Sequence, residues 1–120
     1  MSWKSVHDFE SLVSSWFGAK YGIAVDSCTH GIELCLRLKD IQELSIPKRT
    51  YLSIPSLSHK LGIPLKWRDE DWKEYYEIGN SGIYDAAVLW RENSYIPNSL
   101  MCLSFQFQKH LSLGRGGLIL

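Results

Sequence analysis

Short runs of β-forming residues alternate with segments of helical periodicity along this 120-residue chain, and this alternation constrains the fold most strongly. A β-rich run at 21–25 is followed by a polar turn at 26–31, and apolar residues then recur at helical spacing from 32 to 44. A strand, a polar turn and a largely buried helix in this order are typical of the opening of a βαβ unit. The residues before this unit predict an amphipathic helix that stops at Gly18, with an apolar stripe of Phe9, Leu12, Val13, Trp16 and Phe17.

The rest of the chain continues the alternation. A short helix is expected at 57–61, ending at Gly62, and the expected strands cover residues 50–54, 64–68, 82–89, 101–105 and 117–120. The charged and aromatic stretch at 69–81 carries Trp72, Tyr75 and Tyr76 at helical spacing, which could dock it on the body of the protein. These patterns predict an α/β fold with a mixed, mainly parallel sheet flanked by helices. No repeat or Gly/Ser linker is visible, so we expect a single domain over residues 1–120.

Composition restricts the classes of partner. Hydrophobic residues make up 45% of the chain and five are Trp, which is enough for one core. Thirteen basic and thirteen acidic residues balance, so no overall field favours nucleic acid or an anionic membrane. Three cysteines without a C-x-x-C pair suit a reducing cytoplasm, and four scattered histidines indicate no metal site. With no signal peptide or long apolar run, we expect a soluble, cytoplasmic protein.

Asp85 lies inside an apolar stretch, between Ile83 and Leu89. An unpaired carboxylate is expensive to bury there, so Asp85 requires a cationic or hydrogen-bonding partner. A structural salt bridge or a cap is one interpretation. A heterocyclic N–H of a bound cofactor is the other, and it would give the carboxylate a function.

Lys109 lies between a strand-like run and the glycine loop at 114–117. A lysine that binds an aldehyde must be neutral, and a partly desolvated position favours the neutral amine. A solvated surface lysine is the ordinary alternative. The glycine loop matches neither a phosphate-binding Walker loop nor a dinucleotide fingerprint, and a hairpin turn would also explain it.

Ser27, Cys28 and Thr29 lie between a strand and a helix, where backbone N–H groups and the helix dipole favour an anion. Plain N-capping by Ser27 or Thr29 is the alternative. Ser104 could add a hydroxyl, and Tyr51 could place its ring over a planar cofactor or simply belong to the core. A nucleophilic role for Cys28 lacks an ordered Cys-His-acid set.

These candidates match what pyridoxal 5′-phosphate (PLP) requires: an amine for its aldehyde, an anion for its pyridine nitrogen and donors for its phosphate. The motifs in this order also resemble the DegT/DnrJ-type sugar aminotransferases, PLP enzymes of fold type I. Residues 17–25 resemble the first helix and strand of that family. Residues 27–34 are similar to its Ser-Gly-Thr-x-Ala-Leu phosphate turn, with Cys28 in place of glycine.

Further matches follow along the chain. Tyr51 resembles the aromatic residue that lies near the cofactor ring, and residues 85–87 resemble the Asp-Ala-Ala-Gln motif, with Val88 in place of glutamine. Residues 104–105 and 109–117 resemble the family's Ser-Phe, Schiff-base lysine and glycine-rich segment. Two departures stand out: the stretch at 69–81 replaces a strand and a helix, and no C-terminal small domain follows the lysine loop.

The resemblance implies a shortened fold type I large domain and a PLP-binding aminotransferase homologue acting on a sugar or keto acceptor with an amino donor. Lys109 would carry the internal aldimine and act as general base, Asp85 would hold the ring, and the phosphate would be bound by Ser27, Cys28, Thr29 and Ser104. A homodimer is also implied. Two alternatives stay open: a non-catalytic relic that serves as a binding or regulatory module, and a fragment that needs a second chain.

Overall fold

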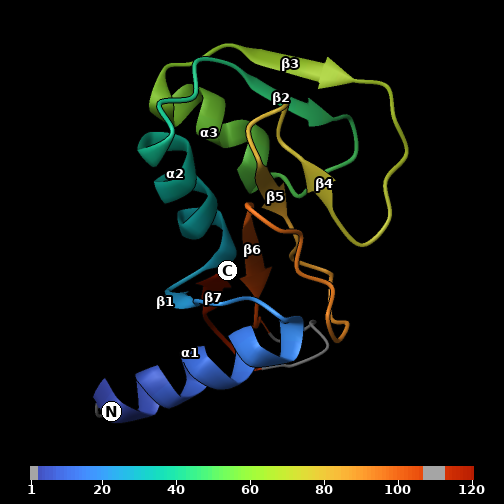
Figure 1. Ribbon diagram of the computed structural model, residues 1–120. Coiled ribbons are helices and arrows are strands. Elements are labelled where there is room, and N and C mark those ends of the chain that lie inside the picture. Colours follow the sequence, from blue (N-terminus) through green and yellow to red (C-terminus); the bar gives the residue numbers. More distant parts are fainter. Residues whose placement is uncertain (1–2, 107–112) are drawn as a thin grey trace.

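The computed structural model describes residues 3–106 and 113–120 as an α/β fold (Figure 1). Its elements in chain order are α1 (Trp3–Phe17), β1 (Ile23–Val25), α2 (Cys28–Leu38), β2 (Leu44–Pro47), α3 (Ser53–Leu61), β3 (Leu65–Arg68), β4 (Tyr76–Glu77), β5 (Ile83–Asp85), β6 (Leu100–Ser104) and β7 (Gly117–Ile119). α1 lies at one end of the molecule, and the small β2–β3 sheet with α3 lies at the other (Figure 1).

The strands form a five-stranded sheet in the order β1-β7-β6-β5-β4 and a separate parallel pair of β2 and β3. The expected mixed α/β architecture is therefore confirmed. Within the five described strands, however, only β5 and β6 pair in parallel, so the sheet is less parallel than the pattern predicted. For β4 and β5 the physical reason is loop length, because the short turn between them returns the chain antiparallel, whereas a parallel neighbour needs a long crossover.

Two core clusters lie on opposite faces of the sheet. Along β6, Cys102 faces the cluster with α2 and α3, whereas Met101 and Leu103 face the cluster with α1. This alternation follows from the two-residue period of a strand. α2 packs closely on the sheet at Gly31, where an added Cβ would lie 3.3 Å from the side chains of Val25 and Ile119.

The first helix matches its prediction in position but not in every contact. Val13 and Phe17 of α1 are buried, and Gly18 ends the helix with a φ of 81°. Leu12 fits the same apolar spacing and yet is 73% exposed. Periodicity thus locates the helix, whereas the packing partners decide how wide its buried stripe is.

Two boundaries in the first half of the chain were predicted wrongly. The expected helix at 32–44 ends at Leu38, because Asp40 adopts a φ of 50°, and Leu44 begins β2 instead. Leu44 is fully buried, so it extends the apolar pattern of the helix without belonging to it. The expected strand at 50–54 is also wrong, since α3 already begins at Ser53.

Pro55 explains the second error. It lies in the first turn of α3, where its missing N–H would have no partner in the helix anyway. The proline therefore belongs to a helix start and does not close a strand. The predicted end of this helix at Gly62 is confirmed, with a left-handed φ of 67°.

In the ranges that the structure describes, no helix is both long and apolar enough to cross a bilayer.

Candidate functional site

Asp85 is the last residue of β5 and is 6% exposed. Its Oδ2 accepts a hydrogen bond from the Tyr76 hydroxyl at 2.8 Å, and its Oδ1 accepts one from the Ala87 N–H at 3.1 Å. The sequence predicted that this carboxylate needs a partner, and the buried phenol of Tyr76 is one of its partners.

The pairing of β4 with β5 brings Tyr76 to Asp85. The two strands are antiparallel, and Tyr76 stands directly opposite Asp85 in the register. Opposite residues in such a pair place their side chains on the same face. Burial and the neighbouring Asp85 carboxylate raise the pKa of the Tyr76 phenol far above its usual value, so the phenol stays protonated and donates.

Cys28 joins the start of α2 to the same carboxylate. Its Sγ lies 3.9 Å from Asp85 Oδ1 and 3.4 Å from the backbone oxygen of Cys102 on β6. A thiol has one proton to donate, and the Cys102 carbonyl is the nearer acceptor. Two segments that resemble family motifs, residues 27–34 and residues 85–87, thus lie in contact within the fold.

Ser27 and Thr29 both have structural partners. Ser27 is the N-cap of α2, and its Oγ accepts a hydrogen bond from the His30 N–H at 3.1 Å. The Thr29 hydroxyl lies 2.7 Å from the Ser53 hydroxyl and so ties α2 to α3. The N-capping interpretation is therefore realised at Ser27, while the first turn of α2 still directs N–H groups out of the helix end.

Gly117 places the glycine-rich segment against this turn. A Cβ on Gly117 would lie 2.7 Å from both the Cys28 nitrogen and the Ser27 carbonyl carbon. Gly117 also pairs with Val25 on one side and with Ser104 on the other. The turn after β1, the end of β6 and the start of β7 therefore meet at one glycine, and Ser104 is buried beside it.

Tyr51 lies on the surface of the protein. It is 69% exposed, so the interpretation as a core aromatic is wrong. It lines a groove of about 420 Å³ between α2 and α3, together with Thr29, Ser53 and Lys60. Tyr51 and Thr29, in the first turn of α2, thus line the same groove.

Lys109 lies outside the described residues, so its position relative to Asp85 is not part of this geometry. Sequence reasoning missed Tyr76 as a site residue. Its helical spacing with Trp72 suggested only a docking role, and no local signal indicates which residue a strand will face. Among the described residues, no group of three or more His, Cys, Asp or Glu side chains could hold a metal ion.

A family model described as the DegT/DnrJ/EryC1/StrS aminotransferase family matches residues 1–63, which is more than half of the 120 residues. The chain belongs to this DegT/DnrJ family. No curated protein matches it in a sequence search.

Solved structures share the fold of this DegT/DnrJ chain. A 3-amino-5-hydroxybenzoic acid synthase superimposes with a TM-score of 0.78 at 20% identity, over 97% of this chain and 42% of the synthase. A protein of Streptococcus pneumoniae described as a sugar aminotransferase, in its PLP form, superimposes with a TM-score of 0.76 at 12% identity, over 95% of this chain and 44% of that protein. DesI in the presence of its TDP-sugar product superimposes with a TM-score of 0.74 at 16% identity, over 100% of this chain and 42% of DesI. The DegT/DnrJ chain thus spans less than half of each of these three proteins.

The described residues of the DegT/DnrJ chain fit PLP at two points. Asp85 is a buried carboxylate that accepts hydrogen bonds from Tyr76 and Ala87, and an acid of this kind suits the protonated ring nitrogen of the cofactor. The Cys28 side chain, in the segment that resembles the family's phosphate turn, is directed at the Cys102 carbonyl of the sheet and is buried there. The acid and the turn are therefore compatible with the cofactor that the family implies.

Proposed function

We propose that this DegT/DnrJ family member binds PLP and is a reduced aminotransferase homologue, transferring an amino group from a donor to a sugar or keto acceptor. The observation that carries the proposal is the buried Asp85 carboxylate, which lies in contact with Cys28 at the start of α2. A buried anion beside a helix N-terminus suits a ligand that has a cationic ring nitrogen and an anionic phosphate.

Each residue would have a separate role. Asp85 would accept a hydrogen bond from the protonated ring nitrogen. The phosphate would be bound by Ser27, Cys28, Thr29 and Ser104. Lys109 would bind the cofactor's aldehyde with its amine and would move a proton at the substrate α-carbon. Tyr51 would cover one side of the ring. When bound, PLP supplies a conjugated electron-withdrawing ring that draws charge from the substrate's amino-bearing carbon.

The proposal includes the domain organisation, the oligomeric state and the location of the protein. Residues 1–120 would form one minimal domain, active as a cytoplasmic homodimer. Exposed apolar side chains on α1 and at the β1 edge of the sheet support a dimer, because they leave surface that a second copy can cover: Leu12, Tyr21 and Ile23 are 73%, 70% and 61% exposed. Gel filtration with light scattering tests this, and a monomer at micromolar concentration would contradict it.

The second candidate is a non-catalytic binding or regulatory module. One observation favours it: Val88, which the resemblance places where the family has glutamine, has a side chain that cannot hydrogen-bond and is 42% exposed. The chain also spans less than half of the aminotransferase structures, which suits a relic or a fragment completed by a second chain. Turnover of an amino donor by the isolated protein would exclude all of these alternatives.

The test of cofactor binding is an absorbance titration with PLP, followed by borohydride reduction and mass spectrometry of the Lys109 peptide. We expect a visible absorption band that reduction removes, and a pyridoxyl adduct on Lys109. Lys109→Ala should abolish the adduct, whereas Lys66→Ala, which changes an exposed lysine of β3, should not. An adduct spread over several lysines, or none, would refute the assignment.

A further inference from the structure

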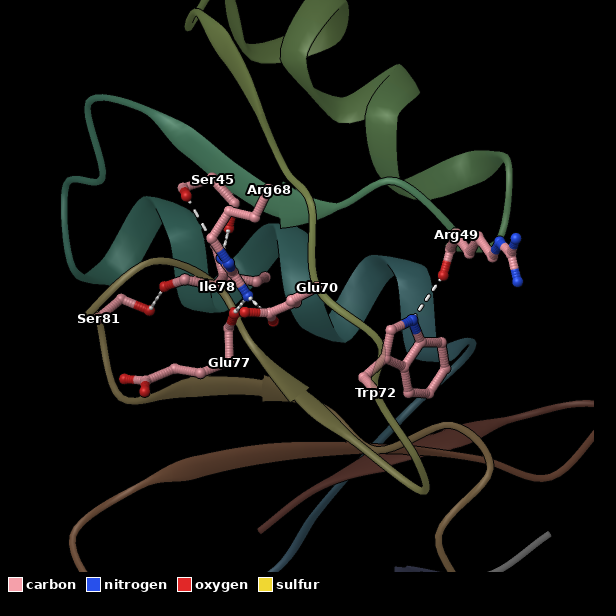
Figure 2. A network of polar contacts seen from close by, with 8 residues as sticks. All are labelled: Ser45, Arg49, Arg68, Glu70, Trp72, Glu77, Ile78 and Ser81. Atoms are coloured by element: carbon pink, nitrogen blue, oxygen red, sulfur yellow. Dashed lines mark hydrogen bonds and ion pairs between the residues drawn. The ribbon is translucent and has the colours of Figure 1, made fainter.

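The stretch that follows β3 is short, and Arg68 anchors it (Figure 2). The Arg68 guanidinium donates to the backbone oxygen of Ser45 on β2 and to that of Glu77 on β4, the latter at 2.7 Å. It also pairs with Glu70 at 2.7 Å. Because the guanidinium is planar and presents its donors in fixed directions, these bonds set the position of β4 relative to the small sheet.

Trp72 and Ser81 hold the same stretch at two further points. The Trp72 indole N–H donates to the Arg49 backbone oxygen at 2.6 Å, and the Ser81 hydroxyl donates to that of Ile78 at 2.6 Å (Figure 2). The Trp72 ring meets the Tyr76 ring edge-on, with centroids 4.9 Å apart. The Tyr76 ring, which is 3% exposed, is thus fixed by packing before its hydroxyl reaches Asp85.

The Tyr76 hydroxyl is the part of this arrangement that packing does not require. A phenylalanine would fill the same space against Trp72, but it would leave Asp85 Oδ2 without the 2.8 Å hydrogen bond. A buried carboxylate needs such donors to stay charged and to hold one orientation. The hydroxyl therefore acts on the carboxylate rather than on the stability of the ring cluster alone.

We propose that Tyr76 is the positioning residue for Asp85: it holds the carboxylate charged and oriented toward the cofactor's ring nitrogen, and Arg68 holds the strand that carries it. The inference rests on the proposed function, in that it assumes PLP at this site. It assigns a role to residues 69–81, the stretch that we interpreted from the sequence as a departure from the family pattern. In this stretch, Tyr76 supplies a hydrogen-bond donor to Asp85, the proposed cofactor-binding acid.

The test compares Tyr76→Phe with the wild type in PLP titrations over a range of pH. A lost hydrogen bond to a charged group should weaken PLP binding about tenfold or more, and should shift the pH dependence of the bound cofactor's spectrum. The matched control is Tyr95→Phe, which removes a phenol hydrogen bond of 2.7 Å to the neutral Ser99 backbone oxygen. The control should leave both readouts unchanged.

Arg68→Gln should weaken PLP binding in the same direction, because β4 loses its anchor, whereas Lys66→Ala on the same strand should not. An equal PLP dissociation constant and an equal pH profile in Tyr76→Phe and the wild type would overturn the inference. A loss no larger than in Tyr95→Phe would overturn it as well.

A second readout separates this inference from the proposed function. In the protein without cofactor, carbon NMR of labelled aspartate should show the Asp85 carboxyl taking up its proton at higher pH in Tyr76→Phe than in the wild type. If the wild type binds no PLP, the proposed function fails and the role toward a cofactor fails with it. The NMR titration then decides whether Tyr76 holds the carboxylate: an unchanged titration would contradict that too.

Discussion

Gly117→Ala should be among the most damaging small substitutions in this protein. The new Cβ would lie 2.7 Å from the Cys28 nitrogen, 2.7 Å from the Ser27 carbonyl carbon and 2.8 Å from the Leu103 backbone oxygen. Cβ atoms essentially never lie within 3.0 Å of such atoms, so all three contacts are too short and something must shift. All three atoms belong to the backbone, so no side chain can rotate away to relieve them.

The magnitude follows from what must move. Gly117 pairs with Val25 and with Ser104, so β7 cannot retreat from the turn without weakening both pairings. Overpacking of a well-packed site costs about 1–3 kcal/mol, and more where the backbone must shift. We expect Gly117→Ala to lower the free energy of unfolding by about 3 kcal/mol or more, a large share of the 5–15 kcal/mol usual for a domain.

Gly62→Ala is the matched control. Gly62 has a left-handed φ of 67°, but no atom lies within 4 Å of the position a Cβ would take. The same methyl group therefore costs only backbone strain there, about 1–2 kcal/mol. Urea unfolding followed by tryptophan fluorescence and far-UV circular dichroism measures both variants. A loss in Gly117→Ala no larger than in Gly62→Ala would refute the close approach of β7 to the turn.

Three further predictions concern stability. The folded-state pKa of Tyr76 is raised above its unfolded value of about 10, so the contribution of this phenol to stability is complete below pH 10 and declines above it. By pH 11 the free energy of unfolding of the wild type should fall by about 1.4 kcal/mol, and that of Tyr76→Phe should not show this fall. Urea titrations at each pH measure the difference. Phe17→Ala, at a fully buried ring, should cost about 3–5 kcal/mol, whereas Leu12→Gln, at a side chain that is 73% exposed, should stay within about 0.5 kcal/mol by thermal unfolding. Ser27→Ala should cost about 1 kcal/mol in the same assay through loss of the cap of α2, and no loss would mean that water replaces the cap.

Local patterns predicted the elements whose limits are set by neighbouring residues. α1 ends just before Gly18 and α3 ends just before Gly62, as expected, because glycine adopts the left-handed conformation at a helix end without a steric cost. The limits of α2 and β2 were missed, since Leu44 fits a helical period equally well and is buried for another reason. An apolar residue indicates burial, but the neighbours that bury it can lie anywhere in the chain.

The sequence by itself determined the order of the family's motifs, the α/β class and the need of Asp85 for a partner. These depend on residue types, spacing and the cost of burying a charge. Only the tertiary structure decided that Tyr76 meets Asp85 and that Gly117 meets Ser27 and Cys28. Both contacts depend on strand register and on the close approach of segments far apart in the chain, and a shift of one residue in register would turn each side chain to the other face of the sheet.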